Sequence, residues 1–180
     1  VVFDIQNIMK FALDMKNADL FEQIYYKVST YLNKQMALKA SEISREYHIS
    51  IFSAIFEHFD IKPHIKKNLK ALETHFNHMR NEAPQKAINR IVQYMGYGDY
   101  LKRTGMSDTK IFIMKSIAGR EDSIKAFLNR MEELKDIIQN KKNESKSLFI
   151  LSTIHGSKGL EYENVYMIDI QNGIIPETIP

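Results

Sequence analysis

Hydrophobic residues recur at intervals of three and four positions along most of the chain. The clearest run places apolar residues four or three apart between Ile61 and Met79, which is the spacing of one face of an α-helix. Pro63 suits the first turn of this helix, where the N–H that proline lacks is not needed, and the helix should end before Pro84. Similar spacing elsewhere predicts roughly seven or eight helices before residue 146.

Start and stop signals divide the remaining helices. We expect helices to start at Asp4, Asp19, Ser29 or Thr30, Ser50 and Ser107. Asp19 and Glu22 have the spacing of a capping box, and glycines should end the later helices. The last predicted helix is long, and its apolar residues follow a 3-4-3-4 rhythm at Ile124, Phe127, Met131, Leu134 and Ile138.

The hydrophobic pattern changes near residue 146. Four apolar residues at 148–151 lead into a polar turn with two glycines, and a second apolar run follows at residues 165–168. An apolar run bounded by turn residues is typical of a strand buried on both faces. The predicted fold is therefore mainly α, with a multi-helix body followed by a short βαβ piece. Two strands do not complete a sheet, so this piece needs neighbouring strands.

The turn between the two predicted strands carries several functional groups. Thr153 and His155 lie two residues apart at the end of the first strand, so both side chains should point to the same side. Ser157 is placed to cap the helical turn that follows. The free N–H groups at that helix start, together with Lys158, would favour a phosphate.

The rest of the turn offers glycines and a carboxylate. Gly156 and Gly159 would let a backbone or a ligand approach closely, and Glu161 is an acceptor suited to a hydroxyl group or a cation. The alternative is a plain connection between a strand and a helix, in which the glycines serve only the turn.

One ten-residue string points to a family. Thr153-Ile154-His155-Gly156-Ser157-Lys158-Gly159-Leu160-Glu161-Tyr162 resembles motif V of the UvrD/Rep-type superfamily-1 DNA helicases. The apolar run at 165–168 and the turn at 173–176 also resemble the segment that follows in this family, with Asn172 where an acidic residue is usual. The family's Gly-Ile-Gly turn, which holds duplex DNA, is not visible, and residues 45–50 occupy its expected place.

The resemblance implies a domain organisation. Residues 1–146 would be a helical 2B-like insertion subdomain, and residues 147–180 would be a partial RecA-like 2A segment, an incomplete α/β domain that carries motif V. The longer protein would be an ATP-dependent DNA helicase or translocase that moves 3′ to 5′ and uses ATP and Mg²⁺. Its partners would be DNA, as a single strand or a junction of single and double strands, and the remaining RecA-like domains of the same polypeptide.

The resemblance implies roles for individual residues only within motif V. Thr153 and His155 would face the backbone of single-stranded DNA. Gly159 and Glu161 would lie towards the ATP, with Glu161 a candidate for the ribose hydroxyls. Lys158 would contact the DNA or the nucleotide.

The chain lacks the other parts of this chemistry. It has no Gly-x-x-x-x-Gly-Lys-(Ser/Thr) phosphate loop, and no apolar strand ends in the paired acidic residues that would hold magnesium. We therefore expect that the chain alone neither hydrolyses ATP nor holds a cofactor. It starts at Val1 and stops at Pro180, which we interpret as an excised piece of a longer protein. The rival hypothesis is a free-standing helical protein-interaction module without nucleotide chemistry.

Three other groups of residues have both a functional and a structural interpretation. Lys62, Lys66 and Lys70 are four residues apart and could contact DNA phosphates, or form the solvated face of an amphipathic helix. His75 and His78 could bind a metal, although a third ligand at suitable spacing is missing. Six tyrosines could stack bases or pack in the core, namely Tyr25, Tyr26, Tyr31, Tyr94, Tyr97 and Tyr100.

The composition narrows the class of protein. Hydrophobic residues make up 44% and charged residues 26%, which fits a soluble globular protein rather than a disordered one. Because there are no cysteines, disulfides and thiolate zinc sites are excluded. The net charge of +3 is a weak hint of polyanion binding. No apolar run approaches the roughly 18 residues of a membrane span, so we expect a cytoplasmic protein without a membrane partner.

Overall fold

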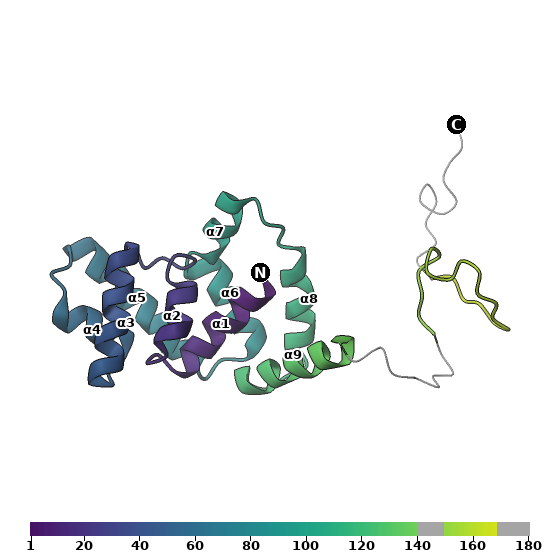
Figure 1. Cartoon of the computed structure of the whole chain (residues 1–180), viewed down its shortest axis with the longest axis horizontal. Helices are drawn as coiled ribbons and strands as arrows, with labels where there is room; N and C mark the ends of the chain where they lie inside the picture. The colour runs from purple at the N-terminus through teal and green to yellow at the C-terminus, as the bar shows by residue number, and fades with distance from the viewer. Residues whose placement is uncertain (140–149, 169–180) are drawn as a thin grey trace. The chain divides into compact units, whose positions relative to one another are not determined.

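The computed structural model describes residues 1–139 and 150–168, and the chain divides into two compact units, Val1–Asn140 and Lys141–Pro180. Figure 1 shows the helical first unit. Its helices within residues 1–139 are α1 (Val2–Leu13), α2 (Ala18–Ile24), α3 (Lys34–Tyr47), α4 (Ile51–His58), α5 (Pro63–Met79), α6 (Pro84–Tyr94), α7 (Tyr97–Thr104), α8 (Thr109–Ala118) and α9 (Ile124–Gln139). The prediction of a mainly α fold is confirmed.

The core of the first unit is built around α1. This helix packs against α2, α5, α6, α8 and α9, and Phe11 is fully buried. The Phe11 ring lies 5.7 Å from Phe21 of α2, 6.4 Å from Phe52 of α4 and 5.1 Å from Phe76 of α5, measured between ring centroids. Burial of such large rings is the main source of core stability. The aromatic cluster therefore joins the consecutive helices α1 and α2 to α4 and α5.

The helix with the clearest sequence pattern forms as predicted. α5 has Pro63 in its first turn and ends at Met79, and its buried residues are Leu69, Leu72, Phe76 and Met79. α4 also follows the prediction of a short apolar helix, with Ser50 as its N-cap. The spacing of apolar residues and the residues at the helix starts were enough to predict these two helices from the sequence.

α2 starts at Ala18, next to the predicted start at Asp19, but the predicted start of α3 at Ser29 or Thr30 was wrong, and neither helix has the predicted cap. Asn17 accepts a hydrogen bond from the Leu20 N–H at the start of α2, and Asn33 accepts one from the Met36 N–H at the start of α3. Asp19 and Glu22 do not form a capping box. Both carboxylates instead accept hydrogen bonds from Arg45, at 2.6 and 2.9 Å.

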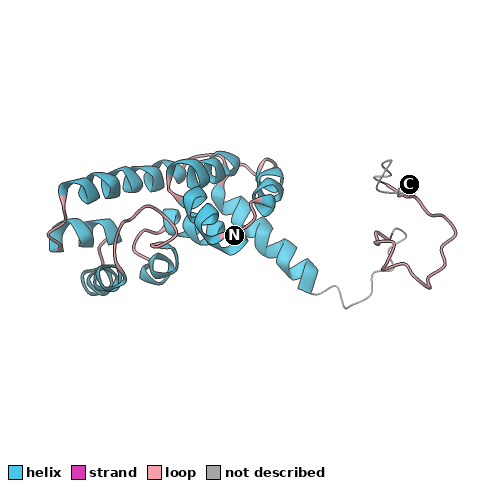
Figure 2. Cartoon of the chain, turned by 90° about the horizontal axis from the view of Figure 1, so that it is seen from above, coloured by secondary structure: helices cyan, strands magenta, loops and turns pink. Residues whose placement is uncertain are grey.

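The last helix is only partly buried. Ile124, Phe127 and Leu128 are the buried residues of α9, whereas Ile138 is 68% exposed. Figure 2 shows the C-terminal half of α9 extending beyond the other helices of its unit. The predicted apolar stripe is therefore buried over its first half and open to solvent over its second.

The predicted βαβ piece is not seen in residues 150–168. Ile150, Leu151 and residues 165–168 are irregular, and residues 154–159 form a turn; residues 148–149 lie outside the described part. Leu151 is 79% exposed and Tyr166 is 82% exposed. A strand needs partners for its backbone N–H and C=O groups, and this unit supplies none in its described residues.

Candidate nucleic-acid interface

The glycine-punctuated turn of the second unit is held by its own hydrogen bonds. The Thr153 carbonyl accepts a bond from the Ser157 N–H at 3.0 Å. The Thr153 hydroxyl accepts one from the Gly156 N–H, also at 3.0 Å, which is the geometry of an N-terminal cap. The prediction that Ser157 caps the turn was wrong, because the Ser157 hydroxyl donates to the Ile154 carbonyl at 3.0 Å.

The two glycines of the turn have different reasons to be glycine. Gly159 has a φ of +84° with no neighbouring atom within 4 Å of an added Cβ, so only its backbone conformation favours glycine. A Cβ on Gly156 would lie 2.9 Å from the Ser152 hydroxyl and 3.1 Å from the Thr153 hydroxyl. A Cβ at Gly156 would therefore crowd the Thr153 hydroxyl that caps the turn and force the two hydroxyl side chains to shift.

The chemically active side chains of the turn are open to solvent. Thr153, His155, Lys158 and Glu161 are all exposed. Within residues 150–168 the side chains of His155, Lys158 and Glu161 make no hydrogen bond or ion pair. Because residues 151–153 are not a strand, the predicted alignment of Thr153 and His155 on one side of a strand end is not observed. The structure thus places these groups on one short turn without organising them into a pocket.

The lysine row lies on the solvated side of α5. Lys62, the N-cap of α5, and Lys66 and Lys70 within it are exposed. They lie beside the stripe that buries Leu69 and Phe76. None of the three ammonium groups forms an ion pair with another described residue. This geometry fits the structural interpretation of the row as the solvated face of an amphipathic helix. It also leaves the positive charges accessible to a polyanion.

One of the two histidines of α5, His75, contacts an ion pair between Arg90 and Glu82. Arg90 forms a two-point ion pair with Glu82 through Nε and Nη2, and its third guanidinium nitrogen, Nη1, lies 2.9 Å from the His75 Nδ1 atom. Burial and the adjacent Arg90 charge lower the pKa of His75. In residues 1–139 and 150–168 no group of three potential ligands could hold a metal ion.

The tyrosines separate into core and surface residues. Tyr97 is fully buried, whereas Tyr26 is 49% exposed and Tyr31 is 64% exposed. Tyr25, Tyr26, Tyr31 and Tyr100 line a pocket of about 350 Å³ in the first unit. Sequence reasoning missed this pocket, because its walls come from residues 25–32 and from the segment around α7. The only sequence signal was the unusual number of tyrosines in both segments.

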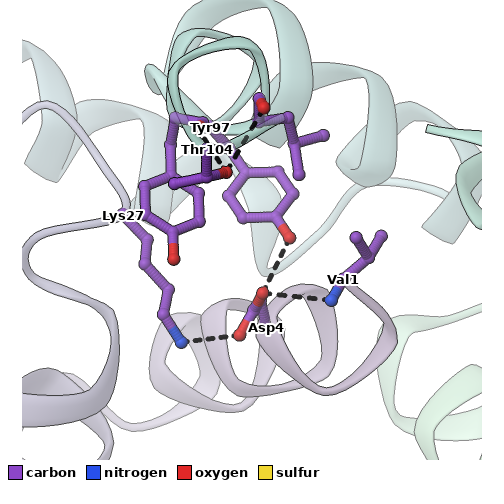
Figure 3. A network of polar contacts seen from close by, with 7 residues as sticks. Val1, Asp4, Lys27, Tyr97 and Thr104 are labelled. Atoms are coloured by element: carbon purple, nitrogen blue, oxygen red, sulfur yellow. Dashed lines mark hydrogen bonds and ion pairs between the residues drawn. The ribbon is translucent and has the colours of Figure 1, made fainter. Parts of the chain in front are cut away.

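Hydrogen bonds connect both walls of this pocket to Asp4 of α1. The Asp4 carboxylate accepts hydrogen bonds from the Lys27 ammonium at 2.6 Å and the Tyr97 hydroxyl at 2.9 Å (Figure 3). Burial would raise the pKa of Asp4, but the hydrogen bonds from Lys27 and Tyr97 outweigh burial and lower it. Burial of the Tyr97 hydroxyl and its bond to Asp4 raise the pKa of that tyrosine far above its usual range.

A helical unit followed by an exposed turn with the string of motif V is the arrangement expected of a UvrD/Rep-type helicase segment. Comparison with known proteins supports this class. The UvrD-like helicase C-terminal domain family matches residues 4–180, and the chain belongs to this family.

A curated relative carries the same assignment in its name. The chain is 28% identical over 182 aligned positions to "Putative ATP-dependent DNA helicase YjcD" of Bacillus subtilis (strain 168). The alignment covers 96% of this chain and 24% of the relative, so the chain spans about a quarter of the length of that protein. No solved structure matched the chain significantly. Among the helices of the described residues, none has the length and apolar character that crossing a bilayer requires.

Proposed function

We propose that the chain is part of an ATP-dependent DNA helicase or translocase. Residues 1–146 would form its 2B-like insertion, and residues 147–180 would belong to a RecA-like 2A domain. The observation that carries this proposal is the motif V string at residues 153–162, at the end of a helical unit, within a chain that matches the helicase family over residues 4–180. The helicase relative of greater length supports the same proposal.

The state of residues 150–168 supports an incomplete domain. Almost every apolar side chain in this segment is exposed, including Ile154, Val165 and Ile168 at 62%, 69% and 71%. Leaving so much apolar surface in water is unfavourable. In the longer protein, pairing with the rest of a RecA-like sheet would bury these residues and convert the two apolar runs into strands.

The exposed turn would contact both ligands of the helicase. Thr153, His155 and Lys158 would bind the sugar-phosphate backbone of single-stranded DNA, and Gly159 and Glu161 would lie at the nucleotide. The residues present fit these roles, since a lysine and an imidazole suit phosphates and an unpaired carboxylate accepts hydrogen bonds from ribose hydroxyls. ATP and Mg²⁺ would supply the phosphoryl transfer that drives movement, and other parts of the longer protein would hold the metal.

The turn would then link the nucleotide to the grip on the strand. Gly159 lies six positions after Thr153, and the backbone bonds from Ser157 to Thr153 and from Leu160 to Ser157 span this interval. A shift of Glu161 towards a nucleotide would therefore move the same turn that carries His155. We propose 3′ to 5′ movement, as the family resemblance implies.

The test uses the full-length protein and separates the two ligands. His155→Ala should raise the DNA concentration that half-maximally stimulates ATP hydrolysis by about tenfold, as expected for one lost charge-assisted contact. Glu161→Gln should instead raise the KM for ATP and leave the DNA requirement unchanged. If both variants behave like the parent enzyme, motif V does not have the proposed role.

A second candidate function rests on a different surface. Phe112 and Ile113 of α8 are 77% and 54% exposed, and an apolar surface of this kind can bind a protein. This observation favours a helical interaction module. Robust DNA-stimulated ATP hydrolysis by the full-length protein would decide for the helicase, whereas an inactive full-length protein would favour the module.

A further inference from the structure

The tyrosine pocket of the first unit lies outside the motif V turn and has its own binding chemistry. Two sequence segments form its walls, residues 25–32 and the segment around α7. Tyr26 packs edge-on against Tyr25 at 5.3 Å and against Tyr100 at 6.1 Å, measured between ring centroids. Such edge-to-face packing fixes the rings in place. The pocket is therefore a rigid aromatic surface rather than a gap between mobile side chains.

Tyr31 is held in a conformation that a large side chain normally avoids. Its φ of 56° lies in the left-handed region, which costs free energy for every residue other than glycine. Tyr31 is 64% exposed, and its ring contacts no other aromatic ring among the described residues. The backbone thus directs an unpaired tyrosine ring towards solvent at the pocket.

The residues on either side of Tyr31 enforce this conformation. The Thr30 hydroxyl donates to the Tyr25 carbonyl at 2.8 Å and accepts from the Leu32 N–H at 3.3 Å. Thr30 and Leu32 are both buried, and the Ser29 N–H donates to the Met95 carbonyl at 2.9 Å. A strained residue that its surroundings over-determine is a recognised mark of a binding position.

The charges at the pocket select the class of ligand. The Arg103 guanidinium lies over the Tyr100 ring at 5.9 Å and the Lys27 ammonium over the Tyr26 ring at 5.2 Å, measured to the ring centroids. Lys27 is neutralised by Asp4, but Arg103 forms no ion pair with any described residue. The Asp99 carboxylate also lines the pocket, so Arg103, rather than an overall positive charge, is the group that would bind an anion. A planar aromatic group attached to an anion would satisfy both the rings and Arg103.

We propose that this pocket binds one nucleotide of single-stranded DNA, with the base stacked on Tyr31 beside Tyr26 and the phosphate contacted by Arg103. A pocket of about 350 Å³ falls in the range of small-molecule sites, which suits one base and not a duplex. The choice of DNA over another nucleotide source rests on the proposed helicase function. The pocket would hold an unpaired base in the helical unit, apart from the backbone contacts of motif V.

The test compares two strands on the 180-residue chain. One is a labelled oligodeoxythymidylate, and the other has the same length and phosphates but abasic sites in place of the bases. Anisotropy gives the two affinities. Because the chain has no tryptophan and nine tyrosines, the part of the tyrosine quenching that Tyr31→Gly removes reports base stacking at the pocket. The parent chain should prefer the base-bearing strand by about tenfold, the usual effect of one stacked base.

Two matched pairs of variants assign the contacts. Tyr31→Gly removes the ring and suits the positive φ, so it should fold, as a thermal melt can verify, and lose the preference for bases. Tyr31→Phe keeps the ring and should keep the preference. Arg103→Gln should lower the affinity of the chain for both strands and reduce the salt dependence of binding. Lys102 is an exposed neighbour outside the pocket, so Lys102→Gln should change neither.

Each other outcome is decisive. If Tyr31→Gly retains the preference for bases, or if the parent chain shows no preference or no binding, the pocket does not take a nucleotide. His155→Ala should lower the affinity for both strands by the same factor, so the preference for the base-bearing strand should remain. Loss of the preference in Tyr31→Gly would uphold the pocket whatever the effect of His155→Ala in this chain, because the role of motif V is tested in the full-length protein, where the rest of its sheet is present.

Discussion

The Tyr97 hydroxyl donates a hydrogen bond of 2.9 Å to the Asp4 carboxylate, across 93 positions of sequence. Lys27 binds the other carboxylate oxygen at 2.6 Å. One acidic side chain on α1 therefore fixes the segment after α2 and the start of α7 at the same place. These are the two segments that form the tyrosine pocket, so its shape depends on Asp4.

Replacement of Asp4 should weaken the helical unit and the pocket together. Asp4→Asn leaves the half-buried Lys27 ammonium without its anion, and the free energy of unfolding should fall by about 2 kcal/mol. Tyr97→Phe removes one hydrogen bond and should cost about 1 kcal/mol. Urea denaturation measures both. If the double variant loses the simple sum of the two single losses, the residues are not coupled as the structure indicates.

Truncation of the central aromatic residue should be more severe. Phe11→Ala removes the ring that joins Phe21, Phe52 and Phe76 and leaves a cavity, so the free energy of unfolding should fall by about 3 to 5 kcal/mol. Phe3→Ala is the control on the same helix, because Phe3 is 65% exposed. Similar melting temperatures for the two variants would show that the core does not centre on Phe11.

His75 should make stability depend on pH. Burial and Arg90 lower its pKa in the folded state, so below its ordinary pKa of 6.5 the unfolded chain binds more protons than the folded chain. The free energy of unfolding should therefore decrease as the pH falls through 6.5. His75→Gln should flatten this decrease when urea denaturation is repeated between neutral and mildly acidic pH.

His78→Gln is the control for this pH effect. The His78 side chain is exposed on α5, and its charge lowers the pKa of His75 less than burial and Arg90 do. Its replacement should therefore leave most of the decrease in place. The interpretation fails if His75→Gln and His78→Gln give the same pH profile as the parent chain.

The lysine row of α5 should contribute non-specific DNA affinity. Replacing Lys62, Lys66 and Lys70 with glutamine removes three accessible charges, so the slope of log affinity against log salt for single-stranded DNA should fall by about 2. The control replaces three exposed lysines elsewhere, Lys39, Lys110 and Lys125, for the same change in net charge. Equal slopes for the two triple variants would mean that the row is only a solvated face.

Elements with strong local signals were the most predictable from the sequence. α5 combines a regular apolar stripe with Pro63 at its start, and its bounds follow from these residues alone. The starts of α2 and α3 were less predictable, because several neighbouring polar residues could cap each helix. Arg45, which lies in another helix, forms ion pairs with the Asp19 and Glu22 carboxylates. Asn17 caps α2 instead.

Features that depend on distant segments were not predictable. Ile138 carries the same periodic signal as Phe127, yet only Phe127 finds neighbouring helices to bury it. The tyrosine pocket requires the Ser29–Met95 hydrogen bond and the left-handed Tyr31, and neither has a local signal. The two predicted strands need backbone partners that the described residues lack, so their local signal was not sufficient to form a sheet. The roles of Thr153, His155, Lys158, Gly159 and Glu161 remain predictions.

Strand separation by the full-length protein tests the central claim most directly. The substrates are a duplex with a 3′ single-stranded tail and the same duplex with a 5′ tail, each with a fluorescent label on the displaced strand. We predict that the protein separates the 3′-tailed duplex when ATP and Mg²⁺ are present, and that His155→Ala slows this reaction strongly. Absence of any ATP-dependent strand separation, or separation of the 5′-tailed duplex alone, would contradict the account.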